Sequence, residues 1–198
     1  MILPDSIRVR VEDALHETLG RPIRVLSGRA LGGGCIHNAL EVSTSDGPLF
    51  VKWNRGAAAA GFGSEARGLE ALRSVTSLRS FICVPHVIAW HDAHDENDFG
   101  WLALEYRPPS APASDFAVNL GRGLAHLHDE PIKGSGWGWH EDNRIGPLVQ
   151  FNPRRTRWGT FWRDARLAPR VEATRIQGVL GSSDLKLLEQ VLDQTESA

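Results

Sequence analysis

Residues 49–72 read LFVKWNRGAAAAGFGSEARGLEAL, which joins a short strand pattern to an amphipathic helix pattern. Residues 49–53 are apolar, β-branched or aromatic apart from Lys52, and this composition favours a strand. A helix pattern follows over about residues 62–74. Its apolar face carries, three or four positions apart, Phe62, Glu65, Leu69 and Leu72. The stretch therefore predicts a strand that presents Lys52, followed by a helix with a carboxylate on its apolar side.

The segments on either side extend this unit into a small antiparallel sheet. Further strand patterns lie at residues 23–26, 39–43, 87–90 and 101–106. Ser45-Asp46-Gly47 is a turn sequence that returns the chain into the Lys52 strand. An amphipathic helix, capped by Asp5 or Ser6 and ending at Leu19, precedes the sheet.

Residues 107–112 read RPPSAP, which suits neither a helix interior nor a central strand. We take residues 107–113 as a hinge between an N-lobe at residues 1–106 and a partial helical C-lobe at residues 114–198. Helix patterns in the second part begin at Ser114, at Trp158 and near Ser182. The last of these is expected to bury Leu185, Leu188 and Leu192. The fold class is α+β, an antiparallel sheet with one main helix followed by helices.

Composition and charge exclude several functional classes. The 198 residues carry a formal net charge of −2, so no basic surface indicates nucleic acid or an anionic membrane. No apolar run approaches the length of a membrane span, and no signal peptide is recognisable. The two cysteines are too few for a disulfide scaffold and favour a reducing, cytoplasmic compartment. The oligomeric state stays open.

Lys52 and Glu65 are the first candidates for chemistry. A carboxylate within an apolar stripe is costly unless a cation meets it, and Lys52 is the natural partner. In protein-kinase-like sites a strand lysine holds nucleotide phosphates and a helix glutamate fixes that lysine. The alternatives are a helix rotated so that Glu65 reaches solvent, and a lysine at a solvated sheet edge.

The glycine run of residues 31–38, LGGGCIHN, is the second candidate. Gly32, Gly33 and Gly34 match neither the Walker A nor the dinucleotide-binding pattern. Between two strands, such glycines can let backbone N–H groups approach phosphate oxygens. The alternative is a flexible turn. Cys35 is either an oxidisable thiol or a small spacer.

The end of the last strand is the third candidate. Glu105, Tyr106 and Arg107 lie where the backbone can pair with a purine edge, the alternative being a plain strand end. Two further clusters carry residue types found in functional sites. Residues 91–95 offer histidines and aspartates to a metal, but in a polar hairpin loop, and a metal is disfavoured. Residues 140–143, HEDN, are too closely spaced for a kinase catalytic loop.

On the basis of these residues, the chain resembles the fructosamine kinase (ketosamine 3-kinase) family, which is related to aminoglycoside phosphotransferases. The resemblance runs in order over nearly the whole chain, and residues 142–167 are its most distinctive part. The matching segments are residues 33–36, 49–52, 65, 68–72, 84–85, 104–106, 121–128, 136–138, 142–146, 150–153, 158–162 and 166–167.

The resemblance implies a protein-kinase-like fold and ATP-dependent phosphorylation of fructosamines or ketosamines at the sugar 3-hydroxyl. Lys52 would contact ATP phosphates, Glu65 would anchor Lys52, and Glu105, Tyr106 and Arg107 would line the adenine. The partners would be ATP and a glycated amine, protein or small ketosamine, with Mg²⁺. The loop over residues 137–152 would flank the ketosamine pocket.

The sequence departs from the family pattern in one respect. The catalytic aspartate and the Mg²⁺ ligands of the family have no counterpart here, so no catalytic or metal-ligating residue is assigned, and these groups are expected beyond Ala198. Turnover by the chain alone is therefore doubtful. The alternatives are an inactive nucleotide-binding pseudokinase and a related kinase acting on aminoglycosides or choline.

Overall fold

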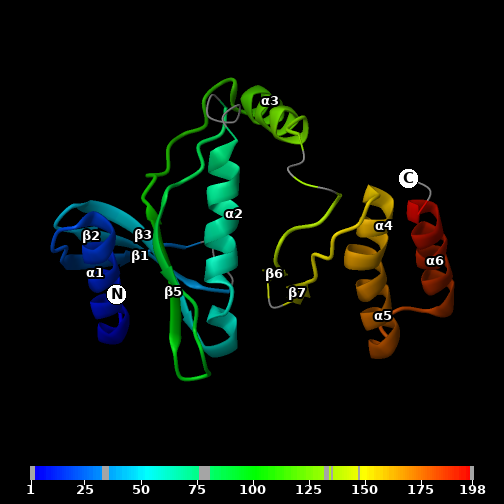
Figure 1. The fold of residues 1–198 in the computed structure, drawn as a ribbon, viewed down its shortest axis with the longest axis horizontal. Helices are drawn as coiled ribbons and strands as arrows, with labels where there is room; N and C mark the ends of the chain where they lie inside the picture. Colours follow the sequence, from blue (N-terminus) through cyan, green and yellow to red (C-terminus); the bar gives the residue numbers. More distant parts are fainter. Residues whose placement is uncertain are drawn as a thin grey trace. The chain divides into compact units, whose positions relative to one another are not determined.

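The computed structural model describes residues 3–32, 36–75, 81–131, 134, 136–146 and 148–196. By internal contacts the chain forms two compact units, Met1–Glu130 and Pro131–Ala198 (Figure 1). Gly33, Gly34 and Cys35, three residues of the predicted phosphate loop, lie outside the described residues. The lobe and hinge boundaries expected from the sequence stay a prediction.

The first unit is built on a five-stranded antiparallel sheet in the order β1-β2-β3-β5-β4. The strands are β1 (Val25–Ala30), β2 (Asn38–Thr44), β3 (Gly47–Arg55), β4 (Val87–His91) and β5 (Phe99–Glu105). β1 begins later than the sequence pattern indicated, because Ile23 is buried in the core before the ladder starts. The other four predicted strands are confirmed. The Lys52 strand is central, since β3 pairs with both β2 and β5.

Alternation along the strands separates two apolar clusters, because successive side chains point to opposite faces of a sheet. Val51 on β3 and Trp101 on β5 belong to one cluster, whereas Phe50 and Leu102 belong to the other. α1 (Asp5–Leu19) covers the first face with Ile7, Val11 and Leu15, all of them buried. The expected cap of α1 is wrong: Pro4 precedes the helix, no side chain caps it, and Asp5 lies in its first turn.

The opposite face of the sheet is covered by α2 (Phe62–Ser74), whose predicted bounds are confirmed. A short 3-10 helix, η1 (Gly56–Ala59), connects β3 to α2. Phe62 and Ala66 are buried against Leu102 and Leu104 of β5. Leu72, by contrast, is 37% exposed, so the apolar face is buried only near the start of the helix. Figure 1 shows α2 running alongside the sheet. The ion pair of Lys52 with Glu65 of α2 places Lys52 on the face that this helix covers.

α3 (Phe116–His128) completes the first unit. The predicted cap at Ser114 is wrong, since the helix begins after Asp115 and no side chain caps it. Gly123 is buried because the segment before β4 packs tightly on the helix: a Cβ added at Gly123 would lie only 2.7 Å from the Ile82 side chain. The ring of Phe81 also stacks on His126, with ring centroids 5.1 Å apart.

The second unit is small and helical. Its elements are β6 (Asn143–Ile145), β7 (Leu148–Gln150), α4 (Trp158–Trp162), the π-helix η3 (Arg163–Leu167), α5 (Ala168–Gln177) and α6 (Ser182–Glu196). The single helix expected around Trp158 is thus divided by a turn of π-helix. α6 begins at Ser182 as expected and contacts α4 and α5. Leu185, Leu188 and Leu192 are only half-buried, because α6 is covered on one side.

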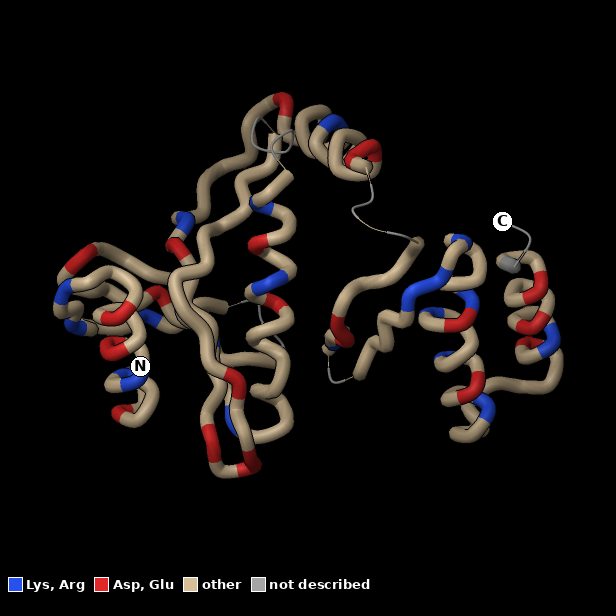
Figure 2. Tube along the Cα trace, viewed as in Figure 1, with Lys and Arg blue, Asp and Glu red and all other residues tan. Residues whose placement is uncertain are grey.

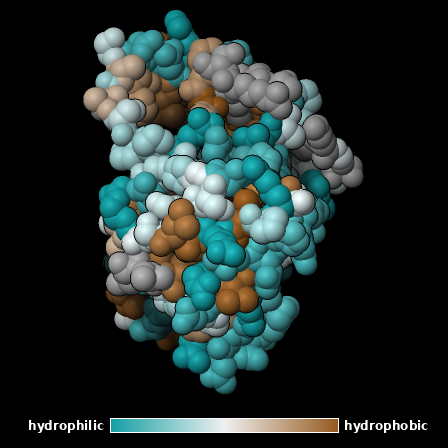
Figure 3. Space-filling model, turned by 90° about the vertical axis from the view of Figure 1, so that its left-hand side faces the viewer, coloured by the Kyte–Doolittle hydropathy of each residue, from teal (hydrophilic) through white to brown (hydrophobic). Residues whose placement is uncertain are grey.

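Charged residues of both signs are interspersed along the chain (Figure 2), which agrees with the small net charge. One face of the molecule shows separate patches of hydrophobic residues among hydrophilic ones (Figure 3). None of the described helices is long and apolar enough to cross a membrane.

Candidate functional site

An ion pair between β3 and α2 lies at the centre of the candidate site. Nζ of Lys52 lies 2.5 Å from Oε1 of Glu65 and also donates to Oε2. The Lys52 side chain is 16% exposed and that of Glu65 is 40% exposed, so the ammonium is the more enclosed partner. Of the two alternatives for Glu65, the structure has the ion pair. A cation held in this way presents a fixed positive charge with little freedom to move.

The helix that carries Glu65 is held at its N-terminus by Asp92. Oδ1 of Asp92 accepts hydrogen bonds from the backbone nitrogens of Gly61 at 2.8 Å and Gly63 at 3.1 Å. Gly61 immediately precedes α2 and Gly63 lies in its first turn, where backbone N–H groups lack partners within the helix. The carboxylate also opposes the positive end of the helix dipole. Asp92, weighed in the sequence as a metal ligand, therefore caps α2 and sets the position of Glu65.

A pocket of about 820 Å³ opens beside the ion pair. Five of the predicted residues that the structure describes line it together: Gly32, Lys52, Glu105, Tyr106 and Arg107. Most of the remaining lining is apolar, and consists of Leu31, Ile36, His37, Ala39, Phe50, Cys83, Pro85, Leu104 and Pro109. Lys52 pairs with Leu102 in the sheet. Glu105 is three positions further along β5, which places it about 10 Å along the strand from Leu102.

The three residues at the end of β5 differ in their contacts. The backbone nitrogen of Glu105 donates a hydrogen bond to the carbonyl oxygen of His86 at 2.9 Å. Its carboxylate forms an ion pair with Arg107 at 2.7 Å. The Tyr106 hydroxyl lies 3.4 Å from Arg29, and partial burial together with the Glu41 carboxylate raises the pKa of this phenol. These side-chain contacts hold the segment at the rim of the pocket.

Sequence reasoning missed the roles of two residues near Lys52. His37 lines the pocket, and its ring packs on Phe62 with centroids 4.8 Å apart. Nζ of Lys52 lies 5.6 Å from the centroid of the same Phe62 ring. Asn54 follows Lys52 by two positions on β3 and contacts Ile36 and His37. Alternation on β3 was the available signal for Asn54, since it shares a face with Lys52. No local pattern distinguished His37 from the rest of the glycine run.

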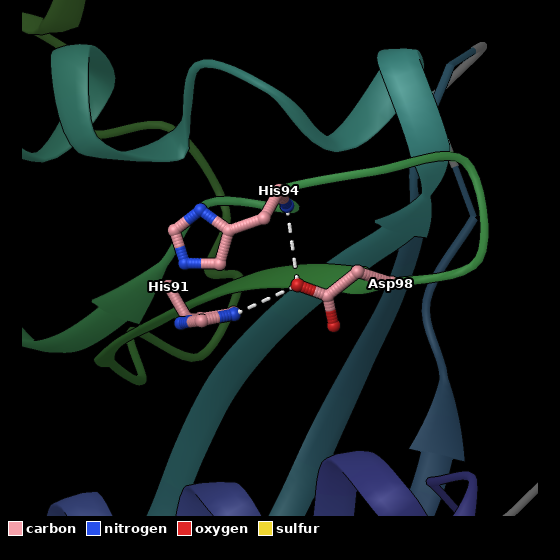
Figure 4. A group of neighbouring side chains, drawn as sticks. All are labelled: His91, His94 and Asp98. Carbon is pink, nitrogen blue, oxygen red and sulfur yellow. Dashed lines mark hydrogen bonds and ion pairs between the residues drawn. The ribbon is translucent and has the colours of Figure 1, made fainter.

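The β4–β5 hairpin brings together His91, at the end of β4, and His94 and Asp98 of the following loop, with possible ligand atoms all within 4.8 Å of one another. Figure 4 shows the three side chains. Both carboxylate oxygens of Asp98, however, already accept hydrogen bonds from the protein. One carboxylate oxygen accepts from Arg10 at 2.6 Å, and the other from His91 at 3.2 Å and the backbone of His94 at 3.1 Å. The Arg10 guanidinium also lies 3.2 Å from Nε2 of His91. A cation of the chain thus holds this cluster and ties α1 to the hairpin.

In the second unit, Asp142 and Asn143 have a structural role. Asp142 accepts from the backbone nitrogen of Asn152 at 2.8 Å, and Nδ2 of Asn152 donates to Oδ1 of Asn143 at 3.2 Å. Asn152 is 5% exposed and also accepts from Arg166. These bonds satisfy a buried amide and join the β6–β7 hairpin to η3.

The described residues fit a nucleotide better than they fit a divalent cation. An apolar pocket with one fixed ammonium at its wall matches the needs of a purine and its phosphates. The carboxylates in or beside the pocket are Glu65 and Glu105, and each is paired with a cation. Among the described pocket residues we therefore assign none to Mg²⁺.

Comparison with known protein families gives one match over most of the chain. The profile of the family described as Fructosamine kinase matches residues 8–197. The protein-ribulosamine 3-kinase of Arabidopsis thaliana is 32% identical over 170 residues, which is 84% of this chain and 50% of the relative. The "Probable ketoamine kinase" of Synechocystis is 30% identical over 166 residues, which is 83% of this chain and 53% of the relative.

Solved structures agree on the fold. A Thermobifida fusca protein assigned as a fructosamine-3-kinase matches with a TM-score of 0.69 and 30% identity, covering 98% of this chain and 62% of that one. A Haemophilus somnus protein with the same assignment has a TM-score of 0.78 at 22% identity, covering 94% and 60%. An aminoglycoside phosphotransferase, APH(4)-Ia, matches at 0.55 and 18%, covering 92% and 57%. The last two likenesses concern the fold alone. The chain spans about half the length of the curated relatives it matches.

Proposed function

Because this chain belongs to the fructosamine kinase family, we propose that it provides the ATP-binding part of a ketosamine kinase. The proposed reaction transfers the γ-phosphoryl group of ATP to the 3-hydroxyl of a fructosamine or ribulosamine, free or on a glycated protein. The relatives named as ribulosamine and ketoamine kinases support this substrate class. With only two cysteines in the chain, the cytoplasm stays the proposed compartment.

The observation that carries the proposal is the Lys52–Glu65 ion pair at the wall of the pocket. In this assignment Lys52 binds phosphate oxygens, and Glu65 keeps its ammonium in place. The apolar side chains of Leu31, Phe50 and Leu104 contact the purine. Glu105, Tyr106 and Arg107 lie along its edge, and Gly32 lies over the phosphates. Positioning a phosphoryl group in this way is most of what a kinase N-lobe contributes to catalysis.

Calorimetric titration with ATP, with and without Mg²⁺, tests the nucleotide assignment. The expected result is saturable binding that Lys52→Ala weakens and that Lys186→Ala, a change of an exposed lysine on α6, leaves unchanged. If both variants bind ATP with the affinity of the wild type, Lys52 does not contact the nucleotide.

The substrate class is tested by ADP release in the presence of fructoselysine or of an aminoglycoside. Stimulation by fructoselysine supports the ketosamine assignment, and stimulation by the aminoglycoside alone would replace it. ATP binding without release of ADP in either mixture would favour a nucleotide-binding protein without turnover.

A further inference from the structure

His37 and Lys52 share one aromatic support in the pocket wall. The imidazole packs on the Phe62 ring at 4.8 Å between centroids, and Nζ of Lys52 lies 5.6 Å from the centroid of that ring. Both side chains line the same pocket. Phe62 is 2% exposed and belongs to the core between α2 and the sheet, so it cannot move easily. His37 is therefore placed next to Lys52, the one lysine among the described residues that line the pocket.

Asn54 determines which ring nitrogen of His37 carries the proton. Nδ2 of Asn54 donates to the carbonyl oxygen of Ile36 at 2.7 Å, which sets the orientation of the amide. The same Nδ2 lies 3.4 Å from Nδ1 of His37. An amide nitrogen donates and does not accept, so Nδ1 is the acceptor in this contact. In a neutral imidazole the proton then lies on Nε2, which is left as a donor.

The surroundings of His37 also keep the ring uncharged near neutral pH. Burial lowers the pKa of His37, and the positive charge of Lys52 lowers it further. Glu65 opposes these effects, but its carboxylate is already paired with Lys52. A neutral ring beside an ammonium avoids the repulsion that a second cation would bring.

We propose that His37 binds the nucleotide as a neutral donor, through a hydrogen bond from Nε2–H to a phosphate oxygen beside Lys52. Asn54 is the positioning residue, because its amide holds Nδ1 as an acceptor. This inference rests on the proposed function and adds a second side-chain contact to the phosphates, beside that of Lys52. The hydrogen bond adds to affinity without adding charge, and its loss is expected to weaken binding by about three- to tenfold.

The test uses titration of the full chain with ATP, ADP and adenosine. His37→Asn places its amide nitrogen near the position of Nδ1, whereas His37→Gln reaches the position of Nε2. The Asn variant is expected to bind ATP and ADP about three- to tenfold more weakly, with adenosine unchanged, and the Gln variant to keep most of the affinity. His128→Asn, at an exposed position of α3, is the control and is expected to match wild type.

Equal ATP affinity in His37→Asn and wild type, or an equal loss for ATP and adenosine, would overturn the role of His37. Failure of the wild type to bind either ligand would instead contradict the proposed function. If His37→Asn does not fold, ¹⁵N NMR spectra of the wild-type imidazole replace that measurement, since they show which ring nitrogen is protonated. A protonated Nε2 that shifts with ADP and not with adenosine supports the contact, and a protonated Nδ1 or no shift overturns it. Asn54→Ala is expected to mix the two tautomers.

Discussion

Lys52 and Glu65 are thirteen positions apart in the chain, yet the ammonium of the first lies 2.5 Å from a carboxylate oxygen of the second. β3 brings Lys52 to the face of the sheet that α2 covers, and the capped first turn of α2 brings Glu65 to meet it. Phe62, one turn earlier on α2, lies under the lysine. The pair is thus positioned by two elements and a shared apolar support.

Replacing Lys52 with alanine is expected to weaken ATP binding by about tenfold or more, because a charge-assisted hydrogen bond contributes about 1.5–3 kcal/mol. Adenosine affinity should stay unchanged, since the lost group contacts phosphate and not the purine. Calorimetric titration measures both ligands, with Lys186→Ala as the control. A parallel loss for adenosine would indicate a damaged fold.

Glu65→Gln is expected to weaken ATP binding by a smaller factor than Lys52→Ala does. The glutamine keeps the size of the side chain but removes the charge that holds Nζ of Lys52, so the ammonium becomes more mobile. Stability should change by about 1 kcal/mol or less, because the carboxylate is 40% exposed and solvent screens the pair. Titration and urea unfolding separate the two effects. Glu70→Gln, on an exposed position of the same helix, is the matched control.

Acid is expected to weaken the contact between α1 and the β4–β5 hairpin. The hydrogen bond from Arg10, joined by those from His94, His91 and Phe99, holds the pKa of Asp98 below its ordinary value of 3.8. A carboxyl group with a lowered pKa in the folded state stabilises it fully above 3.8 and loses this contribution as the pH falls further. Urea unfolding measured at several pH values should show this loss.

The matched variant for that experiment is Arg10→Met, which keeps the length of the side chain without its charge. The pKa of Asp98, followed by NMR of its carboxyl carbon, should rise toward the ordinary value. The fall in stability below 3.8 should become shallower. An unchanged titration of Asp98 in this variant would show that Arg10 is not the main cause.

Burial on the α1 face of the sheet predicts a large difference between two neighbouring positions. Ile7 is fully buried, and Ile7→Ala should lower the free energy of unfolding by about 2–5 kcal/mol. Val9 is 46% exposed on the same helix, and Val9→Ala should change it by about 0.5 kcal/mol or less. Urea unfolding of both variants, followed by circular dichroism, checks the difference. Similar values for the two would mean that α1 does not pack on the sheet as described.

Local patterns were sufficient for most of the first unit. Apolar periodicity predicted α2 at its observed bounds, and the turn at Ser45–Gly47 predicted the pairing of β2 with β3. The same periodicity indicated the Lys52–Glu65 pair, because a carboxylate on an apolar face requires a cation nearby. Such inferences succeed because they depend on residues that are close in sequence or on a strong energetic penalty.

The positions of polar side chains in loops could not be predicted in this way. Asp92 had no periodic signature, and only the return of the β4–β5 loop to the start of α2 makes it a helix cap. The caps expected at the starts of α1 and α3 were wrong, because a capping residue type does not ensure the hydrogen bond. His37 was likewise unrecognised, since its partners Phe62 and Asn54 lie on other elements.

The sequence by itself determined the order of strands and helices in the first unit, the class of the fold and the charged pair of Lys52 and Glu65, because hydrophobic spacing and the cost of burying a charge act locally. The tertiary structure alone decided that Asp92 caps α2, that Arg10 holds the β4–β5 hairpin, and that the amide of Asn54 lies against Nδ1 of His37. These contacts join residues from different elements, and only the packing of α1 and α2 on opposite faces of one sheet brings them within hydrogen-bonding distance.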